Sequence, residues 1–453
     1  MKIFQTGSLS FLAVVLLLTS SCTDQLDLPP LSAIGDNGFY TNTDEVEGGV
    51  IAMYDGLQNV PLREFALTEI RSDNARTKSR EGDWAQFEEL AVQPTNQAIS
   101  DYWINNYNVI FRANRVLESL DVVTDAGLRG EFEGEARFVR ALAHFNLVRA
   151  YGNVPLVDRV IGQEDEEYFD NDTPEAVYAA IEADFDAAAR LLPSASNQTF
   201  GRATSGAAKG LLAKVKLTLG KYGEAESLLR EIINSGEYAL QEEYADVFYS
   251  EGNNEILFAI RYTDDDANES QDFSFEFTNG GSVSGLNFLT DELAAAIEEE
   301  DEERRAVLSN PLVPAENAKF LTQSSDVRLA GNDWIVLRYA DVLLMLSEAL
   351  LAGGESTTNA DAIDAYNQVR ERVGLSTLDD ELTAEMLLME RRIELAFENH
   401  RLYDLIRFGV AQDVLLEFAV NNGFSFSASD LLLPIPQAQI NVSNGLLRQN
   451  PGY

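Results

Sequence analysis

Apolar residues return every three or four positions through most of the chain, which is the period of an amphipathic α-helix. Stripes of this kind run through residues 46–57, 103–117, 136–150 and 177–192. The pair Thr173-Pro174 adds a helix-start signal, because threonine is a good N-cap and proline fits the first helical position. The pattern therefore predicts a mainly helical protein.

Residues 204–235 carry two apolar stripes that are separated by Gly220-Lys221-Tyr222-Gly223. Small residues at the expected crossing and the Gly-x-Tyr turn resemble a tetratricopeptide repeat. A second pair of helices is predicted over 338–352 and 359–373. The spacing between pairs is irregular, so we expect a mainly α fold: a tetratricopeptide-like helical-pair scaffold with long irregular insertions that carry short strands.

The insertions lie near 71–102 and 250–335, where helical stripes are weak. Within the second, Ile256–Ile260 and Phe273–Phe277 read as short strands. Beyond the second helical pair, residues 382–420 predict a long helical hairpin. Irregular insertions on a helical scaffold are where we expect a ligand site to be built.

The chain begins with features of a bacterial lipoprotein signal. Lys2 supplies a positive start, and the apolar stretch from Leu9 to Leu18 has about ten residues, too short for a bilayer that needs roughly 20. Small residues stand directly before Cys22, the only cysteine of the chain, and together they resemble a lipobox. An ordinary secretory signal that leaves Cys22 unmodified is the alternative.

These features predict three parts. Residues 1–21 are a lipoprotein signal peptide, residues 22–38 a tether lipidated at Cys22, and residues 39–453 the body. Pro29-Pro30 favours an extended tether.

Composition narrows the function classes. The chain has 33 basic and 75 acidic residues, a net charge of −42, and 45% of its residues are hydrophobic. The hydrophobic content supplies a packed interior, while the charge repels nucleic acid and anionic lipid headgroups. We therefore expect no nucleic-acid partner, and membrane attachment through a lipid alone.

Several segments together resemble the SusD/RagB family of outer-membrane nutrient-binding lipoproteins of Bacteroidetes. Their order along the chain makes the match specific, although each motif alone is weak. They are Glu135-Ala136-Arg137-Phe138 with Tyr151-Gly152-Asn153-Val154-Pro155, Leu337-Arg338-Tyr339-Ala340-Asp341, Glu390-Arg391-Arg392-Ile393-Glu394, His400-Arg401-Leu402-Tyr403-Asp404, Leu433-Pro434-Ile435-Pro436 and Gln449-Asn450-Pro451-Gly452-Tyr453. Asn399 stands where the family usually has glycine.

The resemblance implies a non-catalytic protein on the outer membrane, lipid-anchored and facing the cell exterior. Such a protein binds oligosaccharide or polysaccharide and delivers it to a SusC-like TonB-dependent barrel transporter. It implies no cofactor. A binder of peptide or another non-glycan nutrient on the same scaffold is the alternative, because a fold does not fix its ligand.

Residues that could carry catalysis or metal binding have a simpler structural interpretation. With 75 acids, no spacing singles out a pair suited to glycoside hydrolysis. Glu390, Arg391 and Glu394 fit ion pairs within one helix. His144 and His400 are far apart in sequence, and each lacks a histidine or cysteine partner. We therefore expect no catalytic residues and no metal site.

Sugar binding needs an aromatic face against the ring and planar polar groups for its hydroxyls. Trp84 in the first insertion is the best candidate, with Asp73, Asn74 and Arg76 nearby. The alternative is that Trp84 pins the insertion to the scaffold. Trp103 lies on a helical stripe and is expected in the core; Trp334 is also more often structural than functional.

Four basic residues lie between positions 71 and 80 of this acidic chain: Arg71, Arg76, Lys78 and Arg80. A basic patch there would suit a carboxylated or sulfated glycan. Pairing with Asp73, Glu81 and Asp83 is the preferred interpretation, so a neutral glycan is expected.

Overall fold

The computed structural model describes residues 40–78, 82–162, 164–278, 285–310, 313, 316–322 and 324–453. The predicted signal peptide, Cys22 and the tether lie outside the described residues.

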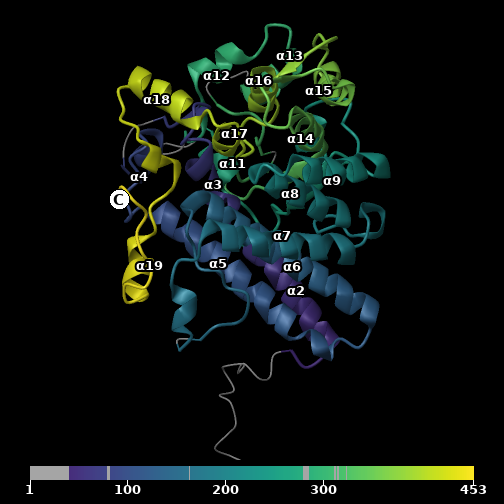
Figure 1. Cartoon of the computed structure of the whole chain (residues 1–453), viewed down its shortest axis with the longest axis vertical. Helices are drawn as coiled ribbons and strands as arrows, with labels where there is room; N and C mark the ends of the chain where they lie inside the picture. The colour runs from purple at the N-terminus through teal and green to yellow at the C-terminus, as the bar shows by residue number, and fades with distance from the viewer. Residues whose placement is uncertain are drawn as a thin grey trace, which may run out of the picture.

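Long helices that follow one another in the chain pack against one another and form the lower and right-hand parts of Figure 1. In order of contact they are α2 (Thr43–Leu57), α5 (Gln97–Glu118), α6 (Ala126–Tyr151), α7 (Pro174–Leu191), α8 (Ser205–Thr218), α9 (Tyr222–Ser235), α14 (Tyr339–Leu351) and α15 (Ala360–Arg372). The helical-pair scaffold predicted from the sequence is confirmed, with α8–α9 and α14–α15 as the two pairs. Helices α9 and α14 pack directly, although the second insertion separates them in sequence.

Local sequence fixes where these helices begin. Thr173 accepts a hydrogen bond from the amide of Ala176 at the start of α7, and Pro174 takes the first helical position, as predicted. The side chains of Asn42, Asn96 and Thr204 cap α2, α5 and α8 in the same way. Each cap supplies an acceptor for an amide that has no partner inside its own helix.

Three short antiparallel strand pairs join distant segments. The strand β1 (Ala75–Arg76) pairs with β3 (Phe288–Leu289), β2 (Ile256–Ile260) with β4 (Trp334–Arg338), and β5 (Ser356–Thr357) with β6 (Leu382–Thr383). The first pair connects the two insertions. The second pair closes the base of the larger insertion, and its register is irregular between Ile256 and Ala259.

The insertions and the C-terminal part add short helices, which gather in the upper and left-hand parts of Figure 1. They are α3 (Pro61–Thr68), α4 (Gly82–Glu88), α10 (Asp246–Tyr249), α11 (Phe273–Glu276), α12 (Asp291–Ala296), α13 (Glu302–Leu308), α16 (Ala384–Glu394), α17 (Arg401–Arg407), α18 (Ala411–Asn422) and α19 (Gln437–Val442), with 3₁₀ turns at Leu120–Val122, Glu166–Phe169, Ala195–Asn197 and Ala428–Leu431.

Two local predictions are wrong. Phe273–Phe277 is not a strand, because Phe273–Glu276 forms the helical turn α11, while the predicted strand Ile256–Ile260 is found as β2. The hairpin predicted over 382–420 is three shorter helices. Phe397 and Asn399 have φ of 65° and 64°, left-handed values that end α16 before α17 begins. Asparagine tolerates this conformation better than most residues, which suits it to a position usually held by glycine.

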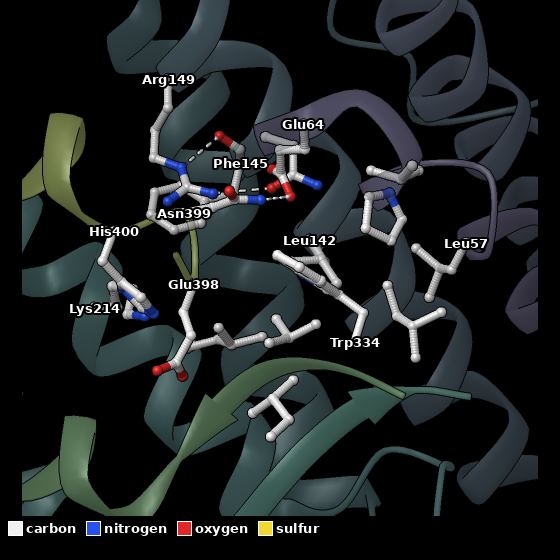
Figure 2. Close-up of a pocket in the computed structure, with 17 residues that line it drawn as sticks. Leu57, Glu64, Leu142, Phe145, Arg149, Lys214, Trp334, Glu398, Asn399 and His400 are labelled. Carbon is white, nitrogen blue, oxygen red and sulfur yellow. Dashed lines mark hydrogen bonds between the residues drawn. The ribbon is translucent and has the colours of Figure 1, made fainter. Parts of the chain in front are cut away.

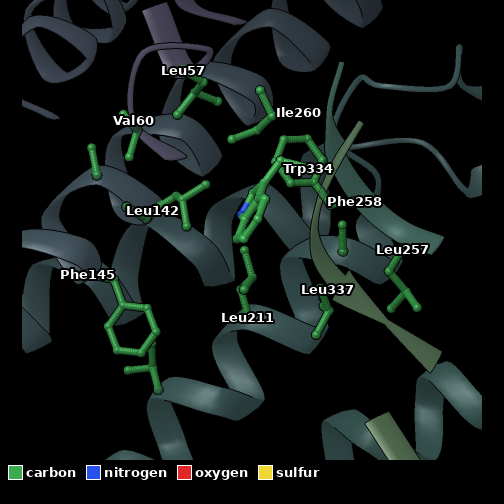
Figure 3. Packing of buried hydrophobic residues seen from close by; sticks show 14 of the residues in the cluster. Leu57, Val60, Leu142, Phe145, Leu211, Leu257, Phe258, Ile260, Trp334 and Leu337 are labelled. Atoms are coloured by element: carbon green, nitrogen blue, oxygen red, sulfur yellow. The ribbon is translucent and has the colours of Figure 1, made fainter. Parts of the chain in front are cut away.

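The core is continuous between the helical stack and the second insertion. Figure 3 shows Trp334 of β4 among Leu142 of α6, Leu211 of α8 and Ile260 of β2. Trp334 is 3% exposed, and its ring also stacks on Phe320 at 5.1 Å between centroids. This packing fixes the base of the insertion against the helices.

No helix among the described residues combines the length and the hydropathy needed to cross a membrane.

Candidate functional site

Buried ion pairs fix the segment that follows α3. The carboxylate of Asp73 accepts two hydrogen bonds from Arg401, at 2.7 and 2.8 Å, and lies 3.0 Å from Nη2 of Arg392. Arg392 Nε donates to Oδ1 of Asn74 at 2.9 Å. Burial raises the pKa of Asp73, but the two arginines outweigh it and leave this pKa below its ordinary value. Asp73 and Asn74 are thus buried and engaged by α16 and α17.

Immediately afterwards the chain forms β1, which holds the two insertions together. The amide of Lys78 donates to the carbonyl of Gly285 at 2.7 Å, beyond the β1–β3 pairing. Gly285 has φ of 122°, and a Cβ there would lie 2.6 Å from Cβ of Lys78. Glycine is therefore required for this close approach.

Trp84 lies on the short helix α4 and is partly buried. Its ring stacks on Phe65 of α3, with centroids 5.9 Å apart and an interplanar angle of 19°, and it also contacts Phe87. Trp84 is therefore held in place by the scaffold while part of its side chain stays exposed. Both interpretations made from the sequence remain compatible with this position, and ligand contact stays a prediction.

Arg80 and its predicted partner Glu81 lie outside the described residues, and Arg71 does not share a surface patch with Arg76. Arg71 is buried and donates to the carbonyls of Leu67 and Asp430, at 3.1 and 2.6 Å. It does not pair with Asp73, whose carboxylate faces the arginines of α16 and α17. The side chain of Arg76 is half-buried and has no hydrogen bond or ion pair with any residue that the structure describes.

A surface groove of about 650 Å³ begins where α4 ends. One side is Glu89–Gln93, and the other is the end of α18 with the C-terminus. Figure 1 shows α4 beside the C-terminus, between α18 and α19. Phe424 and Tyr453 supply aromatic side chains, and the Tyr453 hydroxyl donates to the carbonyl of Leu432 at 2.8 Å. This volume suits a small-molecule site, which typically has about 300–1,000 Å³. No hydrophobic period in the sequence marks this groove.

A second cavity lies inside the protein, between α3, α6, α8 and β4 (Figure 2). Its volume is about 50 Å³. Figure 2 shows Asn399 donating to Glu64, at 3.0 Å, on one wall, and Trp334 on another. A space of this size holds ordered water but no sugar chain. Trp334 is therefore a core residue, and so is Trp103, which is 4% exposed as predicted.

Arg338, from one of the family-like motifs, is the centre of a buried network of carboxylates. Its guanidinium donates to Glu255, Glu394 and Glu398 at 2.8, 2.6 and 2.7 Å. All four side chains are at most 1% exposed. Burial raises the pKa of Glu398, but Arg338 and Lys319 outweigh it, so this pKa lies below its ordinary value. These carboxylates are acceptors fixed by arginine in the interior.

Ion pairing within α16 is not what the structure shows, and that prediction is wrong. Glu390 contacts Arg370 of α15 at 3.0 Å, and Arg391 contacts Asp404 of α17 at 2.8 Å. Glu394 contacts Arg338 of β4. The reason is burial: other elements cover these faces of α16, so its charges find partners across the interfaces.

His144 has a structural role, which its two hydrogen-bond contacts define. His144 is buried; its Nε2 accepts from the amide of Val157, and its Nδ1 lies 3.1 Å from the carbonyl of Arg140. Burial lowers the pKa of His144 to about 4 and that of His400 to about 3. Across the described ranges, no group of three or more His, Cys, Asp or Glu side chains is arranged to hold a metal ion.

Two family models match the chain. The model described as "SusD family" matches residues 316–453, and the model described as "Starch-binding associating with outer membrane" matches residues 39–217. SusD-like protein P38 of Formosa agariphila is 26% identical over 479 residues, covering 92% of this chain and 94% of that protein. A SusD-like protein of Bacteroides ovatus is 25% identical, with 93% and 86% covered.

Solved structures agree along the whole body. A laminarin-binding SusD-like protein is 28% identical, with a TM-score of 0.77, covering 91% of this chain and all of that one. A SusD homologue from Bacteroides thetaiotaomicron has a TM-score of 0.81 at 22% identity, covering 93% of this chain and 99% of that one. At this identity the likeness shows the fold alone. The motifs, the helical-pair fold and these likenesses agree: the chain belongs to the SusD/RagB family.

Proposed function

We propose that this protein is a cell-surface lipoprotein that binds oligosaccharide or polysaccharide and delivers it to a SusC-like TonB-dependent barrel. The observation that carries the proposal is the likeness over 91% of the chain to a laminarin-binding SusD-like protein at 28% identity. The α4 surface, by which we mean Trp84 and Arg76 with the groove that begins at Glu89, supports it from the geometry. Trp84 is partly exposed and held by Phe65, and it lies on the helix that ends where the groove, with its aromatic and polar walls, begins.

In this proposal Trp84 and Arg76 contact the glycan. The exposed part of the indole offers an apolar surface to the C–H face of a sugar ring, and the free guanidinium offers fixed donors to its hydroxyls. Asp73 and Asn74 belong to the same site as positioning residues. Their contacts with Arg401 and Arg392 set the course of β1. The site is thereby built on a rigid support, which lowers the entropy lost on binding.

Attachment and delivery form the second half of the proposal. The Lys2-to-Cys22 pattern supports lipidation of Cys22, an outer-membrane anchor facing the exterior, and the tether at 22–38. Holding a binder beside a transporter raises the local concentration of captured ligand at its mouth. The mass of the mature N-terminus tests the lipid, and Cys22→Ala should release the protein from membranes.

Binding is tested by calorimetry and affinity electrophoresis of the mature chain with laminarin first, then other neutral glycans, acidic glycans and peptides. Trp84→Ala should weaken glycan binding at least tenfold, which corresponds to about 1.4 kcal/mol. Phe111→Ala is the matched control, since this aromatic residue on α5 is 46% exposed and lies outside the α4 site. Binding of peptide without glycan binding would contradict the proposal and select the alternative ligand class.

The same experiment separates neutral from charged glycans. Because Arg71 is engaged inside the protein, Arg76 is the free cation of this segment that the structure describes, and we expect a neutral ligand. Affinity should then change little between low and physiological salt; a steep loss would indicate an anionic ligand.

A further inference from the structure

A separate pocket of about 230 Å³ lies at the open ends of β2 and β4. It shares no residue with the α4 surface or its groove. Its walls come from α10, from the residues just after β2 and from those just before β4. Its lining includes Phe248, Tyr249, Glu251, Asp264, Asn332 and Asp333.

Asp333 lines this pocket and carries an unsatisfied carboxylate oxygen. Its Oδ1 accepts a hydrogen bond from the amide of Tyr262 at 2.9 Å. Its Oδ2 is buried and has no hydrogen-bond partner among the described residues. Arg261 Nε lies 3.8 Å from Oδ2, too far for a hydrogen bond, and that side chain is half exposed. The Asp333 side chain itself is 5% exposed.

Leaving such an oxygen unpaired is unfavourable. A buried acceptor without a donor costs about 1–3 kcal/mol, and a charged one costs more. In native structures almost all buried polar groups have a hydrogen-bond partner, so each exception needs an explanation. A ligand that donates a hydrogen bond to Oδ2 would remove the penalty.

The pocket also presents an aromatic wall. Tyr249 is 37% exposed, and its hydroxyl donates to the carbonyl of Ala318, so the ring is held at its far end. Phe248, the preceding residue, packs edge-to-face on Tyr244 and Phe320. An aromatic ring fixed beside an adjacent amide and carboxylate, Asn332 and Asp333, provides both kinds of contact that a sugar needs.

The charge of the lining residues narrows the chemical class of the ligand further. Glu251, Asp264 and Asp333 line the pocket, and no lysine or arginine does among the described residues. An anionic ligand would meet like charge here. A neutral group with several hydroxyl donors suits the acceptors.

We infer that this pocket is a second binding subsite, taking one neutral sugar unit whose hydroxyl donates to Oδ2 of Asp333 while its ring rests on Tyr249. The inference rests on the proposed function for its ligand class. It goes beyond that function by assigning a site that the α4 surface does not contain.

The test uses methyl β-D-glucopyranoside as the probe, with saturation-transfer NMR on the mature chain. The background is Trp84→Ala, so that the remaining signal reports the Asp333 pocket. Asp333→Asn is the informative variant. Its amide oxygen must still accept from Tyr262, which places an N–H₂ donor where Oδ2 was. Tyr249→Ala removes the aromatic wall independently, and Glu299→Gln, on an exposed acid between α12 and α13, is the control.

We expect the probe signal to persist with Glu299→Gln and to fall at least tenfold with Asp333→Asn or Tyr249→Ala. An unchanged signal in both of these variants, or no signal in the Trp84→Ala background, would overturn the subsite. Displacement of the probe by methylammonium would overturn the assignment to a neutral unit.

Laminarin calorimetry on the unmodified chain, Trp84→Ala and Asp333→Asn keeps the two proposals apart. Trp84-dependent laminarin binding without any Asp333 effect would leave the proposed function standing and remove the subsite alone. Unfolding curves of Asp333→Asn check that the variant is folded.

Discussion

Arg401 and Asp73 form a two-pronged ion pair, with Nε–Oδ1 at 2.7 Å and Nη2–Oδ2 at 2.8 Å. The pair joins α17, in the C-terminal part of the chain, to the segment that leads into β1. Arg392 of α16 reaches the same carboxylate at 3.0 Å. Through these contacts Arg392 and Arg401 position the segment that leads into β1, while Tyr453 of the last motif lines the groove beside α4.

Removing this carboxylate should destabilise the protein strongly. Asp73→Asn leaves two buried arginines facing an amide, and losing one partner of a buried ion pair typically costs about 3–5 kcal/mol. We expect that loss in the free energy of unfolding measured by urea denaturation. Asp186→Asn, which breaks the exposed pair with Arg190 within α7, should change it by less than about 1 kcal/mol. Equal effects of the two substitutions would contradict the positioning role of Asp73.

The Arg338 network should make the protein sensitive to acid. The pKa of Glu398 is lowered in the folded state, where Arg338 and Lys319 outweigh burial. Its contribution to stability is therefore complete above the unfolded pKa, about 4.3, and is lost as the pH falls below it. Thermal unfolding between pH 7 and pH 3 should show this loss. Glu398→Gln should give a shallower decline at acid pH, whereas Glu300→Gln, on an exposed loop residue, should keep the slope of the unmodified protein.

Asp333 should have the opposite dependence on pH. Burial raises its pKa to about 7; Glu251 adds to the effect, while the Tyr262 amide and Arg261 oppose it. A carboxyl with a raised folded pKa gives stability that is present below its unfolded pKa, about 3.9, and lost as the pH rises through 7. In the absence of ligand, Asp333→Asn should therefore be more stable than the unmodified protein at pH 8, and this advantage should vanish near pH 4. An advantage independent of pH would show that the pKa of Asp333 is the same in the folded and the unfolded protein, and would contradict the raised pKa.

The sequence was sufficient for the scaffold because helices that pack in series leave local marks. Thr173-Pro174 marks a helix start, and small residues with Gly220 mark the α8–α9 pair; both are found as predicted. The family-like motifs were equally informative, since Arg338 and Glu394, which come from two different motifs, meet in one buried network.

Long-range partners are what the sequence could not supply. Arg391 and Asp404 are close in sequence, yet Asp73 meets Arg401 only through the fold. Trp334 and Arg71 are likewise buried, and no local sequence pattern around either residue distinguishes a core position from a surface position. The groove beside α4 joins residues near 90 to the C-terminus, and the Asp333 pocket joins α10 to the residue before β4. Neither juxtaposition follows from periodicity.

Two glycines of the α8–α9 pair should respond oppositely to alanine. At Gly210 of α8, a Cβ would lie 2.4 Å from Cδ2 of Leu337 in β4, a side chain that is 1% exposed and has little room to move. At Gly223 of α9, no atom lies within 4 Å of a built Cβ. Alanine favours a helix over glycine by about 1 kcal/mol at both positions.

Overpacking a filled core typically costs about 1–3 kcal/mol, which exceeds that gain when the contact is this short. Gly210→Ala should therefore lower the free energy of unfolding by about 1–2 kcal/mol, whereas Gly223→Ala should raise it by about 0.5–1 kcal/mol. Urea denaturation of the two variants beside the unmodified chain measures both signs. If Gly210→Ala were as stable as Gly223→Ala, helix α8 would have to be farther from β4 than this packing allows, and the close contact that joins the scaffold to the base of the second insertion would be wrong.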